Sequence, residues 1–124
     1  MAPTLSEIFQ TLKKELKRYE PPLVAKVDSD SRYDLWTTKP VEIEGRKRKD
    51  VYFAGLIIQS SYVGFYFMPV YADADIKKVF QPELLRLLKG KSCFHIKTLD
   101  PMLIGQVKAA LAVGFDMYKK RGWV

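Results

Sequence analysis

The chain has one thiol and one imidazole, the groups of a cysteine nucleophile and its general base, and they lie two positions apart. Cys93 is the single cysteine and His95 the single histidine of 124 residues. The alternating segment around them, Ser92 to Lys97, predicts a strand on which positions i and i+2 face the same side about 6.6 Å apart. A direct hydrogen bond between the thiol and the imidazole would require the strand to bend. We therefore expect a half-buried cysteine and a hydrogen-bonded histidine rather than a catalytic pair.

Metal ligands are also scarce in the sequence. A closed zinc site needs four ligands, mostly nitrogen or sulfur, so an open site would have to add a carboxylate such as Asp34 to Cys93 and His95. Asp28, Asp30 and Asp34 form a loose acidic cluster of a kind that either holds a hard cation or, more often, only forms turns. Phosphate-binding glycine loops, nucleophile elbows, HExxH and CxxC motifs are all absent. We therefore expect a binding protein without catalytic residues, metal ligands or cofactor, and not an enzyme.

Composition is that of an ordinary globular protein, with 48% hydrophobic and 28% charged residues, which predicts a single domain over residues 1–124. The first ten residues, MAPTLSEIFQ, lack the features of a signal peptide or presequence, and no apolar run reaches the length of a membrane span. Together with the single cysteine, this predicts a cytoplasmic protein without membrane association. The net charge of +7 favours contact with a polyanion or an acidic partner.

The stretch from Val51 to Tyr71 predicts a β-hairpin, because two runs of β-branched and aromatic residues flank the polar break Gln59 to Ser61. Pro69 is expected to end or kink the second strand. The expected pairs on its wholly apolar, core-facing side are Ile58 with Val63, Leu56 with Phe65 and Ala54 with Phe67.

The opposite, outer face of this hairpin is the candidate binding surface. Two glycines, Gly55 and Gly64, are expected to floor a shallow groove there, because direct neighbours across strands share a face. The expected site comprises Trp36, Phe53, Gly55, Ile57, Tyr62, Gly64, Tyr66, Met68 and His95. An uncovered aromatic patch normally marks a partner protein, a homodimer seam or a small-ligand groove. Alternatively, the short helices expected between Ile76 and Leu88 fold over part of it.

Two long amphipathic helices need a surface on which to bury their apolar stripes. Thr4 and Glu7 form a capping box for a first helix that must end by Glu20, before two prolines. Asp100 and the proline that follows it open a last helix, and Gly122 is placed as its C-cap. Both helices pack most simply on one face of the sheet, so the predicted fold class is α+β: a two-layer sandwich of two long helices on a mainly antiparallel sheet.

Turn residues and alternation of apolar and polar residues predict the structure of the remaining segments. We expect a connection at Leu23–Asp30, a strand at Arg32–Thr38, and at Val41–Ile43 either a short strand or the continuation of that strand past a bulge. A turn is expected at Glu44-Gly45, and short helices at Ile76–Phe80 and Glu83–Lys89. The basic run comprises Arg46, Lys47, Arg48 and Lys49. It is interpreted as a solvated loop that guards a sheet edge, with phosphate or acidic-partner binding as the alternative.

Several stretches also carry a family resemblance. The segments that carry this resemblance are YFAGLIIQ, YVGFYFMPVY, LLKGKSCFHIKTLD and GFDMYKKRGWV. Through them, the sequence from about Ser31 to the C-terminus resembles the YdhG-like domain of unknown function, a bacterial family of small cytosolic proteins. The resemblance implies a fold similar to that of frataxins, and an iron-chaperone role has been inferred for some relatives. Such a role implies carboxylate-rich surfaces, whereas the first helix mixes Glu7, Glu15 and Glu20 with lysines and arginine.

Three functions stay open at this point. The first is a cytosolic domain that binds a small ligand or a protein through the outer face. Frataxin-like iron binding is the second, and single-stranded nucleic-acid binding through the outer face and the basic run is the third. Iron requires clustered carboxylates, nucleic acid requires a contiguous basic rim around the aromatics, and a dimer seam requires neither.

Overall fold

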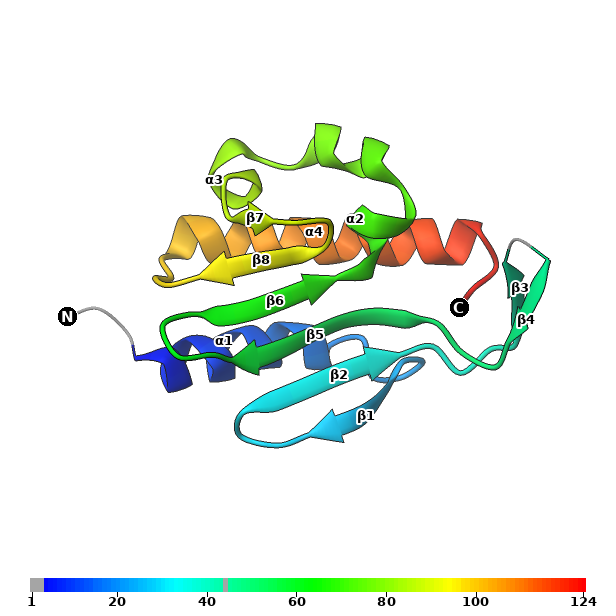
Figure 1. Ribbon diagram of the computed structural model, residues 1–124, viewed down its shortest axis with the longest axis horizontal. Coiled ribbons are helices and arrows are strands. Elements are labelled where there is room, and N and C mark those ends of the chain that lie inside the picture. Colours follow the sequence, from blue (N-terminus) through cyan, green and yellow to red (C-terminus); the bar gives the residue numbers. More distant parts are fainter. Residues whose placement is uncertain (1–3, 44) are drawn as a thin grey trace.

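The computed structural model describes residues 4–43 and 45–124 and has two layers, with helices α1 and α4 lying across one face of a sheet (Figure 1). In chain order the elements are α1 (Leu5–Lys17), β1 (Val24–Asp28), β2 (Arg32–Trp36), β3 (Val41–Ile43), β4 (Arg46–Arg48), β5 (Tyr52–Ile58), β6 (Val63–Phe67), α2 (Met68–Ala72), the 3-10 helix η1 (Ala74–Val79), α3 (Pro82–Leu85), β7 (Leu88–Lys89), β8 (Cys93–Ile96) and α4 (Pro101–Lys120). The sheet has six strands in the order β1-β2-β5-β6-β8-β7, and each neighbouring pair is antiparallel. The predicted α+β fold class is therefore confirmed. Residues 1–3, on which the expectation of no leader partly rests, and Glu44 of the expected turn lie outside the described residues.

Both long helices begin at the predicted caps. The backbone N–H of Glu7 donates to Oγ1 of Thr4 at 3.1 Å, and the Glu7 carboxylate accepts from the Thr4 N–H in return at 3.3 Å, which completes the capping box. At α4, Oδ1 of Asp100 accepts from the N–H of Leu103 at 2.8 Å. Gly122 follows the C-cap with a φ of 75°, the left-handed conformation expected of a glycine just beyond a helix.

The central hairpin has the predicted register. β5 and β6 pair Ala54 with Phe67, Leu56 with Phe65 and Ile58 with Val63. The next strand adds Phe94 opposite Phe65 and Ile96 opposite Val63. These side chains face α1 and α4, and most of them are fully buried, so the hairpin supplies the centre of the hydrophobic core.

Helix α4 approaches the sheet closely at one point. A Cβ on Gly114 would lie 2.5 Å from Cζ of Phe67 and 2.8 Å from Cγ of Pro69. Gly114 therefore has no room for a side chain, whereas Gly105 of the same helix has nothing within 4 Å of its Cβ position.

A β-bulge breaks the alternation of β5 at its start. Leu35 pairs with Ala54, but the next residue, Trp36, pairs with Tyr52, so Phe53 is the extra residue. Phe53 was expected on the outer face, and this prediction is wrong. Its side chain is fully buried in the core and meets the ring of Tyr118 edge-on, with centroids 5.3 Å apart. As a result, Tyr52 takes the outer-face position.

Three strands were missed. The expected connection from Leu23 to Asp30 contains β1, and the basic run forms β4, which pairs with β3 as a small separate ribbon. The helix expected to reach Lys89 ends at Leu85, because Leu88 and Lys89 pair with β8 as the edge strand β7. Strand β6 ends at Phe67, and Met68 begins α2.

The short helices lie with the helical layer and leave the outer face open. The Phe80 ring, which follows η1, lies 6.1 Å from that of Phe67 and 6.2 Å from that of Phe94, both core-facing residues. Oε1 of Gln106, on α4, accepts from the backbone N–H of Leu84 in α3 at 3.0 Å. Figure 1 shows this segment beyond β7 and beside α4. The alternative in which these helices cover the outer face is therefore wrong.

The ribbon of β3 and β4 leaves the sheet through a closed neck. The Thr37 N–H donates to the carbonyl of Val51 at 2.9 Å, and Oγ1 of Thr37 accepts from the Val51 N–H at 2.8 Å. Both residues are buried. Beyond this neck the ribbon projects from one end of the sheet (Figure 1), the end at which β2 stops and β5 starts.

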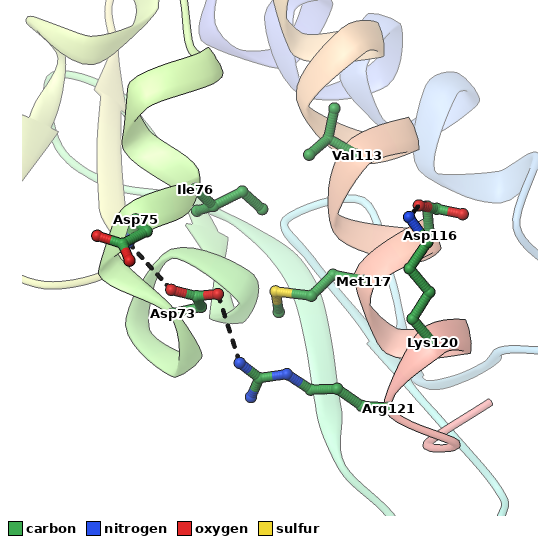
Figure 2. Close-up of a pocket in the computed structure, with 8 residues that line it drawn as sticks. All are labelled: Asp73, Asp75, Ile76, Val113, Asp116, Met117, Lys120 and Arg121. Atoms are coloured by element: carbon green, nitrogen blue, oxygen red, sulfur yellow. Dashed lines mark hydrogen bonds and ion pairs between the residues drawn. The ribbon is translucent and has the colours of Figure 1, made fainter.

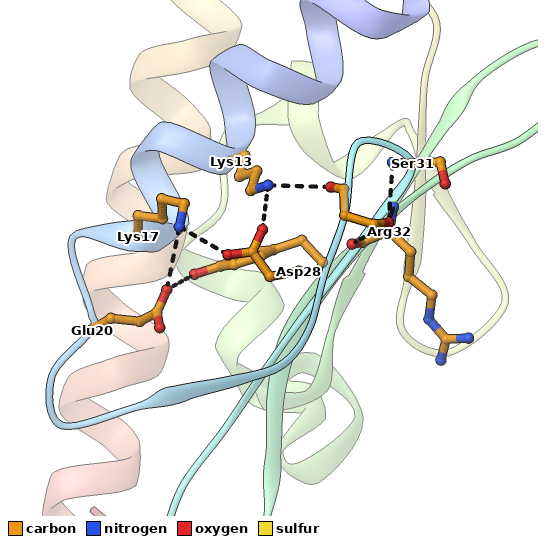
Figure 3. A network of polar contacts seen from close by, with 8 residues as sticks. Lys13, Lys17, Glu20, Asp28, Ser31 and Arg32 are labelled. Carbon is orange, nitrogen blue, oxygen red and sulfur yellow. Dashed lines mark hydrogen bonds and ion pairs between the residues drawn. The ribbon is translucent and has the colours of Figure 1, made fainter.

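An ionic network holds α1 against the edge of the sheet (Figure 3). Lys13 and Lys17 both pair with the carboxylate of Asp28, and Lys13 also donates to the Ser29 carbonyl at 3.2 Å. These two cations lower the pKa of Asp28 through their hydrogen bonds to it.

Within the described part of the chain, no helix is both long and apolar enough to cross a membrane.

Candidate functional site

The outer face of the sheet carries an open groove of about 450 Å³, within the range of small-molecule sites. It is lined by Arg32, Asp34, Trp36, Tyr52, Ile57, Tyr66 and Met68. Four of these, Trp36, Ile57, Tyr66 and Met68, belong to the site expected from the sequence. The groove therefore overlaps the predicted outer-face site, but Gly55 and Gly64, which were expected to form its floor, do not line it, and it has a polar component that the prediction lacked.

Asp34 supplies that polar component. Its side chain is only 8% exposed, although it lines the groove. Its Oδ2 accepts from Nε of Arg32 at 3.0 Å, and its Oδ1 accepts from the hydroxyl of Tyr52 at 3.3 Å. A charge this far from solvent requires such partners, so the three side chains form one polar unit beneath the aromatic walls.

The two glycines do not leave an empty hollow. A Cβ on Gly55 would lie 1.9 Å from the Tyr52 hydroxyl and 2.5 Å from Oδ1 of Asp34. A Cβ on Gly64 would lie 3.0 Å from Cε2 of Tyr66. Each glycine thus makes room for a neighbouring side chain to lie flat over the sheet: Tyr52 and Asp34 over Gly55, and Tyr66 over Gly64.

The tyrosine hydroxyls in this region remain protonated. Burial raises the pKa of Tyr52, and the adjacent Asp34 carboxylate raises it further. Burial also raises the pKa of Tyr66, with a smaller contribution from Cys93. Both phenols can therefore act only as neutral hydrogen-bonding groups at physiological pH.

Cys93 and His95 each associate with a different tyrosine. The His95 ring stacks on Tyr62 with centroids 3.8 Å apart and an interplanar angle of 13°. Cys93 lies opposite Tyr66 in the register, and burial raises the pKa of its thiol. Neither Cys93 nor the stacked pair of Tyr62 and His95 lines the groove. The raised pKa keeps the thiol protonated, which opposes nucleophilic chemistry.

Cations border the aromatic surface. The ammonium of Lys26 lies 4.1 Å from the centroid of a Trp36 ring and also pairs with Asp50. The guanidinium of Arg32 is at the groove itself, on a side chain that is 55% exposed. The ribbon leaves the sheet between Trp36 and Tyr52, and its Arg46, Lys47 and Arg48 and the following Lys49 are all exposed. The ribbon that carries the basic run thus joins the sheet at the end where the groove residues Trp36 and Tyr52 lie, although no residue of the run lines the groove.

A second hollow, of about 400 Å³, lies between α4 and the segment of α2 and η1 (Figure 2). Four of its five charged groups pair with one another, Asp73 with Arg121 at 3.5 Å and Asp116 with Lys120 at 2.9 Å, and Asp75 pairs with Lys78 at 3.7 Å. The charged residues of the groove, Arg32 and Asp34, are paired as well, but the walls of the second hollow include no aromatic ring.

The carboxylates that iron binding would need are dispersed and paired. Asp28 pairs with Lys13 and Lys17, and Asp73 pairs with Arg121. Within residues 4–43 and 45–124, no group of three or more His, Cys, Asp or Glu is placed to hold a metal ion.

Sequence reasoning missed three groove residues for different reasons. Arg32 and Asp34 alternate with Trp36 along β2, so the period of two already places them on its face. Tyr52 carried no such signal, because only the bulge turns it outward in place of Phe53.

Comparisons with protein-family models, with curated proteins and with solved structures give no match for this chain. The resemblance to the YdhG-like family therefore stays a prediction.

Proposed function

We propose that this protein is a cytosolic binding module, rather than an enzyme, that holds single-stranded nucleic acid against its outer sheet face. Bases stack on the aromatic side chains, and phosphates contact the cations around them. The observation that carries this proposal is the position of the basic ribbon, which emerges between two groove residues, Trp36 and Tyr52. Aromatic platforms combined with a positively charged track are the usual means of binding single strands.

The aromatic groups are suitably arranged for stacking. Trp36, Tyr52 and Tyr66 line the groove, and Tyr62 with His95 forms a second aromatic surface toward the other end of β6. All are partly exposed on a face that no helix covers. Stacking of a base on such a side chain contributes about 1–3 kcal/mol and depends little on sequence.

Charge favours a polyanion over a second copy of the chain. Two copies joined through this face would bring chains of net charge +7 together at their cationic borders, which self-repulsion opposes. The two carboxylates nearest the groove, Asp34 and Asp50, are already paired with Arg32 and Lys26. A polyanion would instead find partly exposed rings in the groove and exposed cations on Arg32 and on the ribbon.

The test is fluorescence anisotropy of a labelled, mixed-sequence oligonucleotide about ten nucleotides long, titrated with protein at several salt concentrations. Binding should weaken with salt, with a slope of about 0.7 in log K per phosphate contact. Replacing Lys47 and Arg48 together with glutamine should reduce that slope by about 1.4. The matched control replaces Lys14 and Lys120, exposed residues of the helices on the opposite face, and should leave the slope unchanged.

A second readout follows Trp36 itself. The chain has two tryptophans, and Trp123 packs edge-on against Tyr118 in the helical layer. In a Trp123→Phe protein the remaining fluorescence reports on the groove, and stacking of a base should quench it. Absence of oligonucleotide binding at low salt would rule the proposal out, and a dimer in sedimentation that buries Trp36 would assign the face to a second copy instead.

A further inference from the structure

We infer that the groove recognises guanine in the bound strand through Asp34 and Arg32. The inference rests on the proposed function and specifies which base the groove selects. It follows from the hydrogen-bonding capacity that these two side chains retain, from the geometry that fixes them, and from the sign of the charge at the bottom of the groove.

The Asp34 carboxylate keeps free acceptor sites. An ionised carboxylate offers about four lone-pair positions, and the described structure fills one on each oxygen, with Nε of Arg32 at 3.0 Å and the Tyr52 hydroxyl at 3.3 Å. The side chain nevertheless lines the groove with 8% of its surface exposed. A ligand group that reaches it must donate hydrogen bonds, because an ionised carboxylate can only accept.

Guanine is the base whose pairing edge presents two adjacent donors. Its N1–H and its exocyclic amine can donate to both oxygens of one carboxylate. Adenine and cytosine instead place a ring-nitrogen acceptor beside their amino group, and uracil or thymine flanks its single N–H with carbonyl oxygens. Each of these would bring an acceptor against a desolvated carboxylate, which leaves an unmade hydrogen bond in a poorly solvated site.

Arg32 complements the rest of the same edge. Its Nε is bound to Asp34, while the terminal N–H groups belong to a side chain that is 55% exposed at the groove. A guanidinium offers five donors in a fixed plane, so the terminal groups can donate to O6, which follows N1–H on the guanine edge. Carboxylate and guanidinium together therefore match the donor, donor, acceptor order of guanine.

Charge and shape separate the base from its phosphate. The carboxylate at the bottom of the groove repels a phosphate, whereas the rings of Trp36, Tyr52 and Tyr66 on its walls accept a planar base. The phosphates then lie outside, toward Lys26 and the ribbon. Gly55 permits this arrangement, because the Tyr52 hydroxyl and Oδ1 of Asp34 both lie where its Cβ would be.

The experiment uses Trp36 fluorescence in the Trp123→Phe protein with oligothymidylates that carry one central guanine, adenine or cytosine. The guanine strand should bind about 5- to 150-fold more tightly than the others, the discrimination of a good bidentate contact between side chain and base. In Asp34→Asn an amide NH2 group, which is a donor, replaces one carboxylate oxygen. The preference for the guanine strand should then disappear, while salt-dependent binding of the thymidylate strand remains.

Two further variants keep the test decisive if Asp34→Asn folds poorly, which circular dichroism will show. Arg32→Gln removes the donor to O6 at an exposed side chain and should reduce the guanine preference several-fold. Arg48→Gln, in the ribbon, should weaken all strands by the same factor and leave the preference intact.

The outcomes separate the inference from the proposed function. Equal binding of all strands by the Trp123→Phe protein overturns guanine recognition and leaves nucleic-acid binding standing. Failure to bind any strand overturns the proposed function. Binding of guanosine monophosphate as tightly as the guanine strand overturns nucleic acid as the occupant.

Discussion

The hydroxyl of Tyr118, on the last helix, donates to the backbone carbonyl of Tyr52 at 2.7 Å. This bond spans the core and ends at the bulge that turns Tyr52 outward and Phe53 inward. Burial raises the pKa of Tyr118, so the phenol stays a donor. Because the bulge displaces the ladder at this point, Tyr118 supplies a partner for a carbonyl next to the groove.

Tyr118→Phe should therefore destabilise the protein although it removes a single oxygen. The Tyr52 carbonyl would lose its partner, and an unsatisfied buried acceptor costs about 1–3 kcal/mol. Urea unfolding followed by circular dichroism measures the loss, with Tyr71→Phe, at a residue 58% exposed, as a control that should change little. Equal stabilities of the two variants would contradict the role assigned to this bond.

Replacing either of two glycines of α4 with alanine should change the stability of the protein, but in opposite directions. Gly114→Ala places a methyl group 2.5 Å from Phe67 and should cost about 1–3 kcal/mol through overpacking. Gly105→Ala meets nothing within 4 Å and should stabilise the helix by up to about 1 kcal/mol. Thermal unfolding of both variants checks the pair, and a stabilised Gly114→Ala would show that α4 is free to move away from the sheet.

Stability should fall in alkaline solution. Burial is the largest cause of the raised pKa of Tyr33, Tyr52 and Tyr118, whose ordinary value is 10.0. The unfolded chain therefore releases these protons at lower pH than the folded chain does. Their contribution is fully present below pH 10.0 and is lost as the pH rises above it.

Urea midpoints measured between about pH 8 and about pH 11 test this expectation. Tyr52→Phe removes one of the three groups, so its midpoint should depend less steeply on pH than that of the parent protein. Tyrosinate absorbance that reached its full amplitude while the protein was still folded would contradict the raised pKa values.

The parts of the fold that could be predicted are those with local signals. Thr4 and Asp100 cap the long helices through their own side chains, and the polar break at Gln59 to Ser61 sets the hairpin register. Fold class follows from these elements, because two amphipathic helices need one sheet face.

The missed elements depend on contacts between distant segments. The leucines before Lys89 favour a helix, but pairing with β8 makes Leu88 and Lys89 a strand. At the groove, Tyr52 and Phe53 are adjacent aromatics, and either one suits a core position. The choice between them is made by the bulge, which no local pattern reveals. The point at which the basic ribbon joins the sheet likewise depends on where β2 ends and β5 begins.

The hydrogen bonds between Thr37 and Val51 hold the two ends of the segment 38–50 together. They do so independently of the residues within that segment. Val41 packs against the hydrophobic core, but Arg46 to Lys49 are exposed, so substitutions in this basic run leave the core untouched. The charge of the ribbon can therefore change rapidly during evolution, or be altered by grafting, while the sheet and its aromatic groove are inherited unchanged.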